Sequence, residues 1–407
     1  MSFETALSGV AAAQAHLDIV SNNIANVNST GFKRSRAEFG EIFAQTRTGL
    51  SNTAVGQGTR LTAINQQFTQ GSIEGTNNNL DMAIDGNGFF VLTDAGGATT
   101  YSRSGIFQLD DNGYVTNSDG AFLNGFPADP TTGLTSGTMG SIQFDTSNLS
   151  PTATTDASFD LNLDAGEAAI AATFDATDPS TYNHTTHVTV YDSLGTSHIA
   201  TQYFTKTAAN TWDTRSFIDG NAVGGATTLT FDTSGTLTAV GADTTAPLEI
   251  ALPAYTPTGA AAMNITINLT DTNQLDADFS ITAQTQDGNP TGIITDISIS
   301  GDGSVFANFS NGESRVLSQI ALANFTNQQG LESIGNSQWR ESRDSGLPRI
   351  GQPNSAELGR IRSGSLEAAN VNISRELVDL ILAQRNFQAN SQSISTENTV
   401  TQTILNI

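Results

Sequence analysis

The chain has 407 residues, no cysteine, and forty acidic against sixteen basic residues, so its formal net charge is −24. A chain of this length holds roughly two to four domains. Without cysteine it forms no disulfide and no thiolate site. The strong negative charge argues against binding nucleic acid or an anionic membrane surface. No run of about 18 apolar residues occurs, so no membrane-spanning helix is predicted.

An amphipathic helix is predicted at the N-terminus, from about residue 2 to about residue 26. Its apolar stripe repeats every seven residues and is flanked by Ala6, Ala13 and Val20. The members of the stripe are Phe3, Leu7, Val10, Leu17 and Ile24. A heptad pattern of this kind marks a helix face that packs against another helix.

A second amphipathic helix is predicted at the C-terminus, beginning near Ser365. Its apolar stripe consists of Leu366, Ile373, Leu377, Leu380, Phe387, Ile394 and Leu405. Some seam positions of both helices are polar, such as Gln14 and Gln384. A polar seam residue sets register and partner at a cost in stability.

The two stripes allow two kinds of packing. An apolar helix face usually belongs to a protein's own core, so the two helices could pack on each other within one chain. We favour packing between neighbouring copies instead, because the stripes are longer than one antiparallel pair needs and the sequence predicts no further helix to complete a bundle. The twelve stripe residues are therefore the predicted polymerisation interface.

The middle of the chain is predicted to be β-structure. Apolar residues alternate there between turns rich in Gly, Asn and Asp, which is typical of short antiparallel strands. Residues 71–147 and 285–349 are predicted to form one β domain, with residues 148–284 inserted as a second. The predicted fold class is mainly β with terminal α-helices, a coiled-coil-like helix pair and two nested antiparallel β domains.

Two segments are predicted to connect the helices with the β domains. Residues 28–70 and 350–365 are rich in turn residues, and we predict connecting linkers there. Within the first of them, Phe39, Ile42 and Phe43 follow one another at helical spacing.

The residues that could carry chemistry do not form a complete site. His184, His187 and His198 lie close in sequence, yet His184 and His187 on one strand would point to opposite faces. Gly86-Asn87-Gly88 lacks the third glycine and the following helix of a phosphate-binding loop. We therefore predict no catalytic residue, no cofactor, no metal site and no enzymatic activity.

Several stretches resemble the bacterial flagellar axial proteins, the family of rod, hook and hook-associated proteins. Residues 21–33, Ser-Asn-Asn-Ile-Ala-Asn-Val-Asn-Ser-Thr-Gly-Phe-Lys, are similar to its N-terminal signature. Further similar stretches are 70–73, 79–90, 101–107, 113–115, 363–371 and 384–390. In the middle, the hairpin from Val188 to Phe204 resembles the outer domain of the hook members.

The resemblance implies a layered subunit of a tubular polymer. Its layers would be D0 (1–27 and 366–407), D1 (71–147 and 285–349) and D2 (148–284). It implies a flexible universal joint that transmits torque from rod to filament. The implied partners are copies of the same chain, the rod, the hook cap, the hook-filament junction protein and the type III export apparatus.

The resemblance also implies a place outside the cell, in the flagellar hook. Because no basic residue precedes Lys33 and polar residues such as His16 interrupt the apolar positions, no cleavable signal peptide is predicted. Two alternatives remain open at this point. One is a distal rod or other basal-body component, and the other is a secreted β-rich adhesin or glycan-binding protein.

Overall fold

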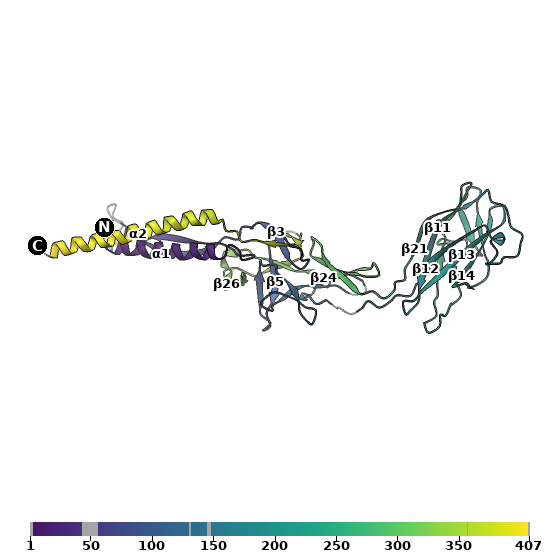
Figure 1. Cartoon of the computed structure of the whole chain (residues 1–407), viewed down its shortest axis with the longest axis horizontal. Coiled ribbons are helices and arrows are strands. Elements are labelled where there is room, and N and C mark those ends of the chain that lie inside the picture. The colour runs from purple at the N-terminus through teal and green to yellow at the C-terminus, as the bar shows by residue number, and fades with distance from the viewer. Residues whose placement is uncertain (1–2, 43–55, 130–131, 145–147, 356, 406–407) are drawn as a thin grey trace. The chain divides into compact units, whose positions relative to one another are not determined.

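The computed structural model describes residues 3–42, 56–129, 132–144, 148–355 and 357–405. The described chain is mostly β-strand with one long helix near each end, which confirms the predicted fold class (Figure 1). It divides into two compact units. Unit 1 comprises Met1–Thr146, Asp296–Ala307 and Ser314–Ile407, and unit 2 comprises Ser147–Thr295 and Asn308–Glu313.

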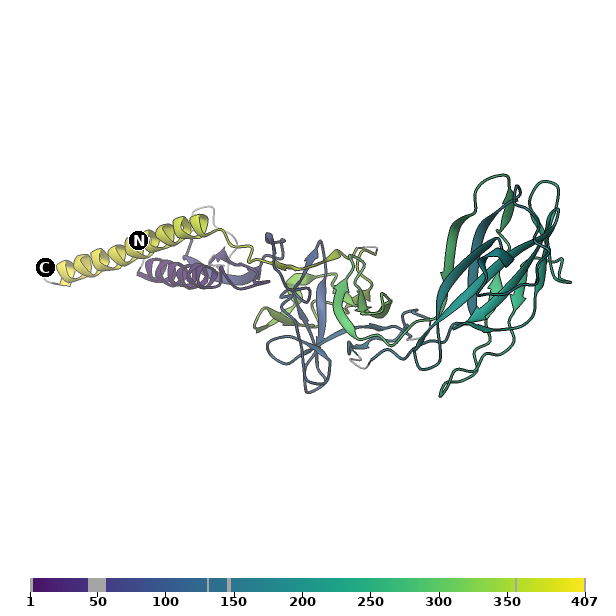
Figure 2. The same ribbon diagram turned by 45° about the vertical axis from the view of Figure 1, so that its right-hand side comes forward.

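The two helices belong to unit 1 and lie side by side (Figures 1 and 2). Helix α1 spans Phe3–Ala25 and helix α2 spans Ile373–Leu405. The pair is antiparallel, because Asn23 near the end of α1 contacts Glu376 near the start of α2. Helix α2 begins after Asn372, whose side-chain oxygen accepts a hydrogen bond from the Arg375 amide at 3.1 Å, as an N-cap residue does.

The start of α2 differs from the prediction. Residues Ser365–Glu367 form strand β30, which pairs with β3 (Ile73–Gly75), so Leu366 belongs to a strand and not to the helical stripe. Similarly, β29 (Arg360–Ser363) pairs with β4 (Met82–Asp85). These two small sheets join the early and late parts of the chain just before α2.

The segment expected as the first linker contains an ordered hairpin. Strand β1 (Ser35–Glu41) pairs with β2 (Thr59–Gln66) in antiparallel register, and both strands lie against α1. Phe39 is therefore a strand residue and its helical spacing was misleading, while Phe43 lies outside the described residues. Residues 350–365 likewise contain strand segments, so both predicted connecting stretches include regular structure.

The β part of unit 1 is built on one large sheet with the order β22-β23-β24-β9-β5-β6-β27-β26. Its apolar side chains form two clusters, one around Phe90 and Leu123 and one around Phe89 and Trp339. The strands are β5 (Phe89–Thr93), β6 (Thr99–Ser102), β7 (Gln108–Leu109), β8 (Val115–Thr116), β9 (Phe122–Pro127), β10 (Gly140–Ser141), β22 (Ile294–Ile299), β23 (Ser304–Phe309), β24 (Ser314–Ile320), β25 (Leu322–Asn324), β26 (Glu332–Gly335), β27 (Gln338–Arg340) and β28 (Arg349–Gly351), with a short 3₁₀ helix at Gln328–Gly330.

Unit 2 consists of two sheets with a shared core. The first has the order β12-β13-β14-β16-β17, and the second contains β18, β19, β11, β20 and β21. Buried side chains of both sheets, such as Phe159, Phe204 and Trp212, form one cluster. The strands are β11 (Asp156–Asp164), β12 (His184–Tyr191), β13 (Ser197–Ala208), β14 (Thr211–Ile218), β15 (Asn221–Ala222), β16 (Thr227–Phe231), β17 (Leu237–Val240), β18 (Glu249–Ala251), β19 (Thr266–Asn268), β20 (Asn273–Leu275) and β21 (Ser280–Gln286), with a 3₁₀ helix at Pro179–Thr181.

Strand direction in unit 2 differs from the prediction at one strand. Most neighbouring strands are antiparallel, as predicted, but β11 pairs in parallel with both β19 and β20. The long strand β11 runs alongside two short ones that follow each other much later in the chain. Such a pairing depends on contacts more than a hundred residues apart, so local alternation could not reveal it.

Candidate assembly interface

Small residues allow α1 and α2 to approach each other closely. Ala6 and Ala13 are buried on α1, and Ala383 is fully buried on α2. At Gly9 a Cβ atom would come within 2.6 Å of the Asn390 side-chain oxygen, so only glycine fits without displacing Asn390. The residues that flank the predicted N-terminal stripe therefore form the seam between the helices.

The helix pair within one chain corrects the prediction that the helices find their mates only on neighbouring copies. Half-buried side chains accompany the seam, and on α2 they share the face of Ala383. This half-buried group consists of Val10, Leu17, Ile24, Leu380, Phe387 and Ile394. In contrast, Phe3, Leu7, Ile373 and Leu377 are exposed, Leu366 lies half-buried in β30, and Leu405 ends α2.

Helix α2 carries a second apolar face that α1 does not cover. Its side chains follow one another at spacings of one, three and four residues, so they lie together on the first turns of the helix. Each is between 45% and 56% exposed in the single chain. We call this set the outward stripe, and it consists of Ile373, Leu377, Val378, Ile381 and Leu382. Val378, Ile381 and Leu382 were not among the twelve predicted interface residues, although their spacing of three and four residues was a visible signal.

A polar network holds the base of the helix pair. Asn23 is 1% exposed, and its amide group exchanges two hydrogen bonds of 2.9 Å with the backbone of Ser35 in β1. The same side chain donates to Glu376 of α2 at 3.2 Å, and Arg34 contacts the Glu376 carboxylate at 3.3 Å. One asparagine therefore ties α1, β1 and α2 together.

Asn370 makes a second connection, between the two ends of the chain. Its side-chain oxygen accepts from the Arg34 amide at 2.8 Å, and its side-chain nitrogen donates to the carbonyl oxygens of Gln67 at 2.6 Å and Thr69 at 3.0 Å. The segment after α1, the segment after β2 and the segment before α2 meet at this residue.

Three charged side chains lie buried beside this connection. Glu367 is fully buried and receives Lys33 Nζ at 2.6 Å, Arg103 Nη1 at 3.1 Å and the Gly71 amide at 2.9 Å. We call Lys33, Arg103 and Glu367 the charged triad. Desolvation lowers the pKa of Lys33 and of Arg103, and the attraction of Glu367 opposes this shift at both.

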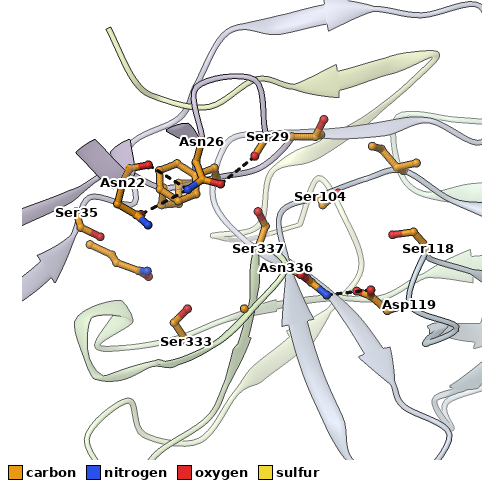
Figure 3. A pocket seen from close by; sticks show the side chains of 16 residues that line it. Asn22, Asn26, Ser29, Ser35, Ser104, Ser118, Asp119, Ser333, Asn336 and Ser337 are labelled. Carbon is orange, nitrogen blue, oxygen red and sulfur yellow. Dashed lines mark hydrogen bonds between the residues drawn. The ribbon is translucent and has the colours of Figure 1, made fainter. Parts of the chain in front are cut away.

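A polar cleft of about 590 Å³ lies at the end of α1 and is lined mainly by amide and hydroxyl groups (Figure 3). Asn22 reaches it from α1, Asn26 from the turn that follows α1, and Asn336 from the turn between β26 and β27. Both carboxylate oxygens of Asp119 are occupied, by Asn336 at 2.9 Å and Gln338 at 2.7 Å. Asp119 therefore anchors the turn, and the cleft offers hydrogen-bonding groups rather than a poised acid or base.

Family models of flagellar proteins match both ends of the chain and a long central stretch. They are "Flagella basal body rod protein" at residues 3–33, "Flagellar hook protein FlgE/F/G D1 domain" at 83–162, "Flagellar basal body protein FlaE D2 domain" at 161–289 and "Flagellar basal body rod FlgEFG protein C-terminal" at 362–407.

Relatives with the name "Flagellar hook protein FlgE" match the chain from end to end. The protein of Escherichia coli strain K12 is 37% identical and that of Salmonella typhimurium 36% identical, each over 100% of both chains. The protein of Treponema pallidum is 30% identical over 100% of this chain and 99% of its own. The chain belongs to the flagellar hook protein family.

A solved structure shows a similar fold. The crystal structure of the Helicobacter pylori flagellar hook protein FlgE2 has a TM-score of 0.55 at 15% identity, and the match covers 72% of this chain and 100% of that one. Within the described residues, neither helix is long and apolar enough to span a bilayer.

The family decides between the functions that the sequence left open. The chain is a structural subunit of the bacterial flagellar hook and not an enzyme, and it assembles with copies of itself in the flagellum. The alternatives of a rod component and of a secreted adhesin lose their support, because the full-length relatives are hook proteins.

Proposed function

We propose that the outward stripe of α2, together with Phe3 and Leu7 of α1, binds the terminal helices of neighbouring copies in the inner tube of the hook. The observation that carries this proposal is the exposure of the stripe after α1 has covered the opposite face of α2. Removing the rest of one such side chain from water contributes on the order of 1 kcal/mol. Five side chains on adjacent turns supply enough apolar surface to hold helices together.

The predicted interface residues would then act at two levels. Those exposed in the single chain contact the neighbour directly, and those on the seam hold α1 against α2. The helix pair, not the single helix, is the unit that assembles. Contacts of this kind that do not close into a ring build an open helical tube.

The domain layout proposed for the subunit is that of the flagellar axial proteins. Matches to the D1 and D2 family models and the separate compactness of unit 2 support it. Its parts are D0 (1–27 and 366–407), D1 (71–147 and 285–349), D2 (148–284) and connecting segments (28–70 and 350–365). The hairpin β1–β2 gives the first connecting segment an ordered structure.

The assembled tube would serve as a flexible universal joint that transmits torque from rod to filament. Forty acidic residues against sixteen basic ones favour outer surfaces that repel one another and slide as the tube bends. The rod, the hook cap, the hook-filament junction protein and the type III export apparatus are the further partners we propose.

The outward stripe can be tested with one double variant. We expect Leu377→Asp/Ile381→Asp to form no tubes at concentrations at which the parent assembles, because two carboxylates would be buried without partners. Circular dichroism should show the helical content of the parent. Electron microscopy of the purified protein measures the outcome.

The matched control is Ser395→Asp/Thr399→Asp, which adds the same two charges at the same spacing to exposed positions of α2 beyond the stripe. This variant should assemble. Tubes of normal number and length from the double variant would contradict the proposed interface.

The proposed route of export concerns the N-terminus. Mass spectrometry of the extracellular protein should show a chain that begins at Met1 or Ser2, because α1 is needed for the helix pair. A mature terminus beyond Ala15 would remove part of the seam and contradict both the route and the role of α1.

A further inference from the structure

The charged triad lies where both helices leave the β part of unit 1. Lys33 follows α1 by a short turn, and Glu367 precedes α2 by a short segment. Lys33 also donates to the carbonyl oxygen of Thr69 at 2.9 Å, and Arg103 donates to that of Gly86 at 2.8 Å. The single carboxylate of Glu367 therefore joins the N-terminal segment, the C-terminal segment and the β sheet region.

The triad is poorly suited to a purely stabilising role. It buries two cations against one anion, with side chains that are all at most 4% exposed. Removing charges from water costs more than such pairs usually return, and apolar residues of similar volume are often as stable or more stable. A buried charge does, however, raise the free energy of every packing arrangement in which it loses its partner.

A shift in register would impose that penalty here. Leu366 of β30 and Ala368, which follows the strand, flank Glu367 in the chain, so a slip of one residue would present an apolar side chain to Lys33 and Arg103. Both cations would then be buried without a counter-charge. The β3–β30 pair is only three residues long, which makes its register weakly specified by backbone hydrogen bonds alone.

Two glycines show how closely the segments meet around Glu367. The Gly31 amide donates to the Glu367 carbonyl oxygen at 2.8 Å, and at Gly31 the backbone has φ +69°. A Cβ atom at Gly71 would come within 2.0 Å of the Ala368 carbonyl oxygen. Because the segments are packed this closely, a C-terminal segment in another register would also move the start of α2.

We propose that the charged triad is a register lock, which fixes where α2 starts relative to α1 and so presents the outward stripe in the orientation that assembly needs. Lys33, Arg103 and Glu367 are positioning residues and do not touch the neighbouring copy. This inference rests on the proposed assembly through the terminal helices.

The first test is Lys33→Met, which leaves Arg103 and Glu367 as a balanced pair. The variant should keep the thermal transition of the parent but lose the link to the N-terminal segment. If only about a tenth of the molecules keep the correct register, the critical concentration for assembly rises about tenfold. Because the natural chain has no cysteine, spin labels at Gln14→Cys and Gln384→Cys can report the helix register.

A narrow distance distribution between these labels is expected in the parent and a broad or shifted one in Lys33→Met. The triple variant Lys33→Met/Arg103→Met/Glu367→Met should behave likewise, with a melting temperature equal to or above that of the parent. A parent-like distance and critical concentration in both would overturn the register lock. Loss of the fold in Lys33→Met would also overturn it, since the triad would then be needed for stability itself.

Failure of this inference is distinct from failure of the proposed function. Parent-like distance and assembly in both Lys33→Met and the triple variant refute the register lock and leave the proposed helix interface untouched. Normal assembly of Leu377→Asp/Ile381→Asp refutes the helix interface on which the lock depends.

Discussion

Unit 2 and the terminal helices bury apolar surface to very different extents. In unit 2, Phe159, Phe204 and Trp212 are completely buried between two sheets. In α2, Ala383 is the one buried residue among the apolar residues whose side chains are described. Unit 2 therefore satisfies its own core, whereas α2 leaves much of its apolar surface for another molecule. The contrast separates the residues that determine folding from those that determine assembly.

The largest effect on folding is expected in the core of unit 2. Phe204→Ala should lower the free energy of unfolding by about 3–5 kcal/mol, because it removes a buried ring and leaves a cavity. Each unit contains one buried tryptophan, so Trp212 fluorescence in a Trp339→Phe background reports unit 2 during urea unfolding.

Ile381→Ala is the control for Phe204→Ala, because it truncates an exposed side chain of α2. It should shift the Trp212 transition by no more than about 0.5 kcal/mol, as surface substitutions usually do. It should nevertheless raise the critical concentration for assembly. An equal loss of unfolding free energy in Phe204→Ala and Ile381→Ala would show that α2 contributes to the stability of unit 2. That result would contradict the contrast between the two regions.

A smaller effect is expected at the base of the helix pair. Asn23→Ala leaves both backbone groups of Ser35 without their partner, at a cost of about 1–3 kcal/mol for a buried group. Hydrogen exchange at the Ser35 amide should accelerate. Asn22→Ala, an exposed neighbour, should leave that amide protected, and equal exchange in the two variants would argue against the role of Asn23.

The smallest effects are expected from two histidines of unit 2 with opposite pKa shifts. Burial alone would lower the pKa of His198, but its ring contacts Asp219 at 2.6 Å and Asp192 at 3.4 Å, and these carboxylates raise it. Burial lowers the pKa of His184, and Glu167 and Asp164 only partly offset this.

The signs of the two contributions follow from linkage. An unfolded histidine titrates near pH 6.5. His198 contributes stability that is fully present below about pH 6.5 and is lost as pH rises through its raised pKa. His184 contributes stability that is lost as pH falls from about 6.5 through its lowered pKa.

Urea midpoints of the Trp212 transition between about pH 5 and 8 can separate the two histidines. His198→Gln should flatten the alkaline side of the profile, and His184→Gln should flatten the acidic side. If either variant changes the opposite side, the assigned direction of that pKa shift is wrong.

The sequence revealed the elements of this fold better than their partners. Heptads predicted both helices, and the alternation of apolar residues predicted short antiparallel strands such as the β12–β13 hairpin, because these patterns are local. They did not show which face of α1 is buried. Phe3 and Leu7 are larger than Ala6 and Ala13, but the small residues form the seam since they let the helices approach.

Long-range contacts explain the remaining differences. Leu366 continued the heptads of α2, yet β3 and the cations around Glu367 hold that segment as a strand. Phe39 showed helical spacing, while its partner strand begins at Thr59. A buried charge pair between residues 33 and 367 has no local signal at all. In the sequence, Lys33 stood out only as the first basic residue of the chain and as the end of a family signature.

Protection of the outward stripe in the polymer tests the central claim most directly. With no natural cysteine in the chain, Ile381→Cys can be labelled with a thiol reagent without background. Thr189→Cys on an exposed position of unit 2 serves as the control for reagent access, and its labelling should be fast in monomer and tube. The account predicts fast labelling of Cys at position 381 in the monomer and strong protection in assembled tubes. Equally fast labelling of position 381 in both states would contradict it.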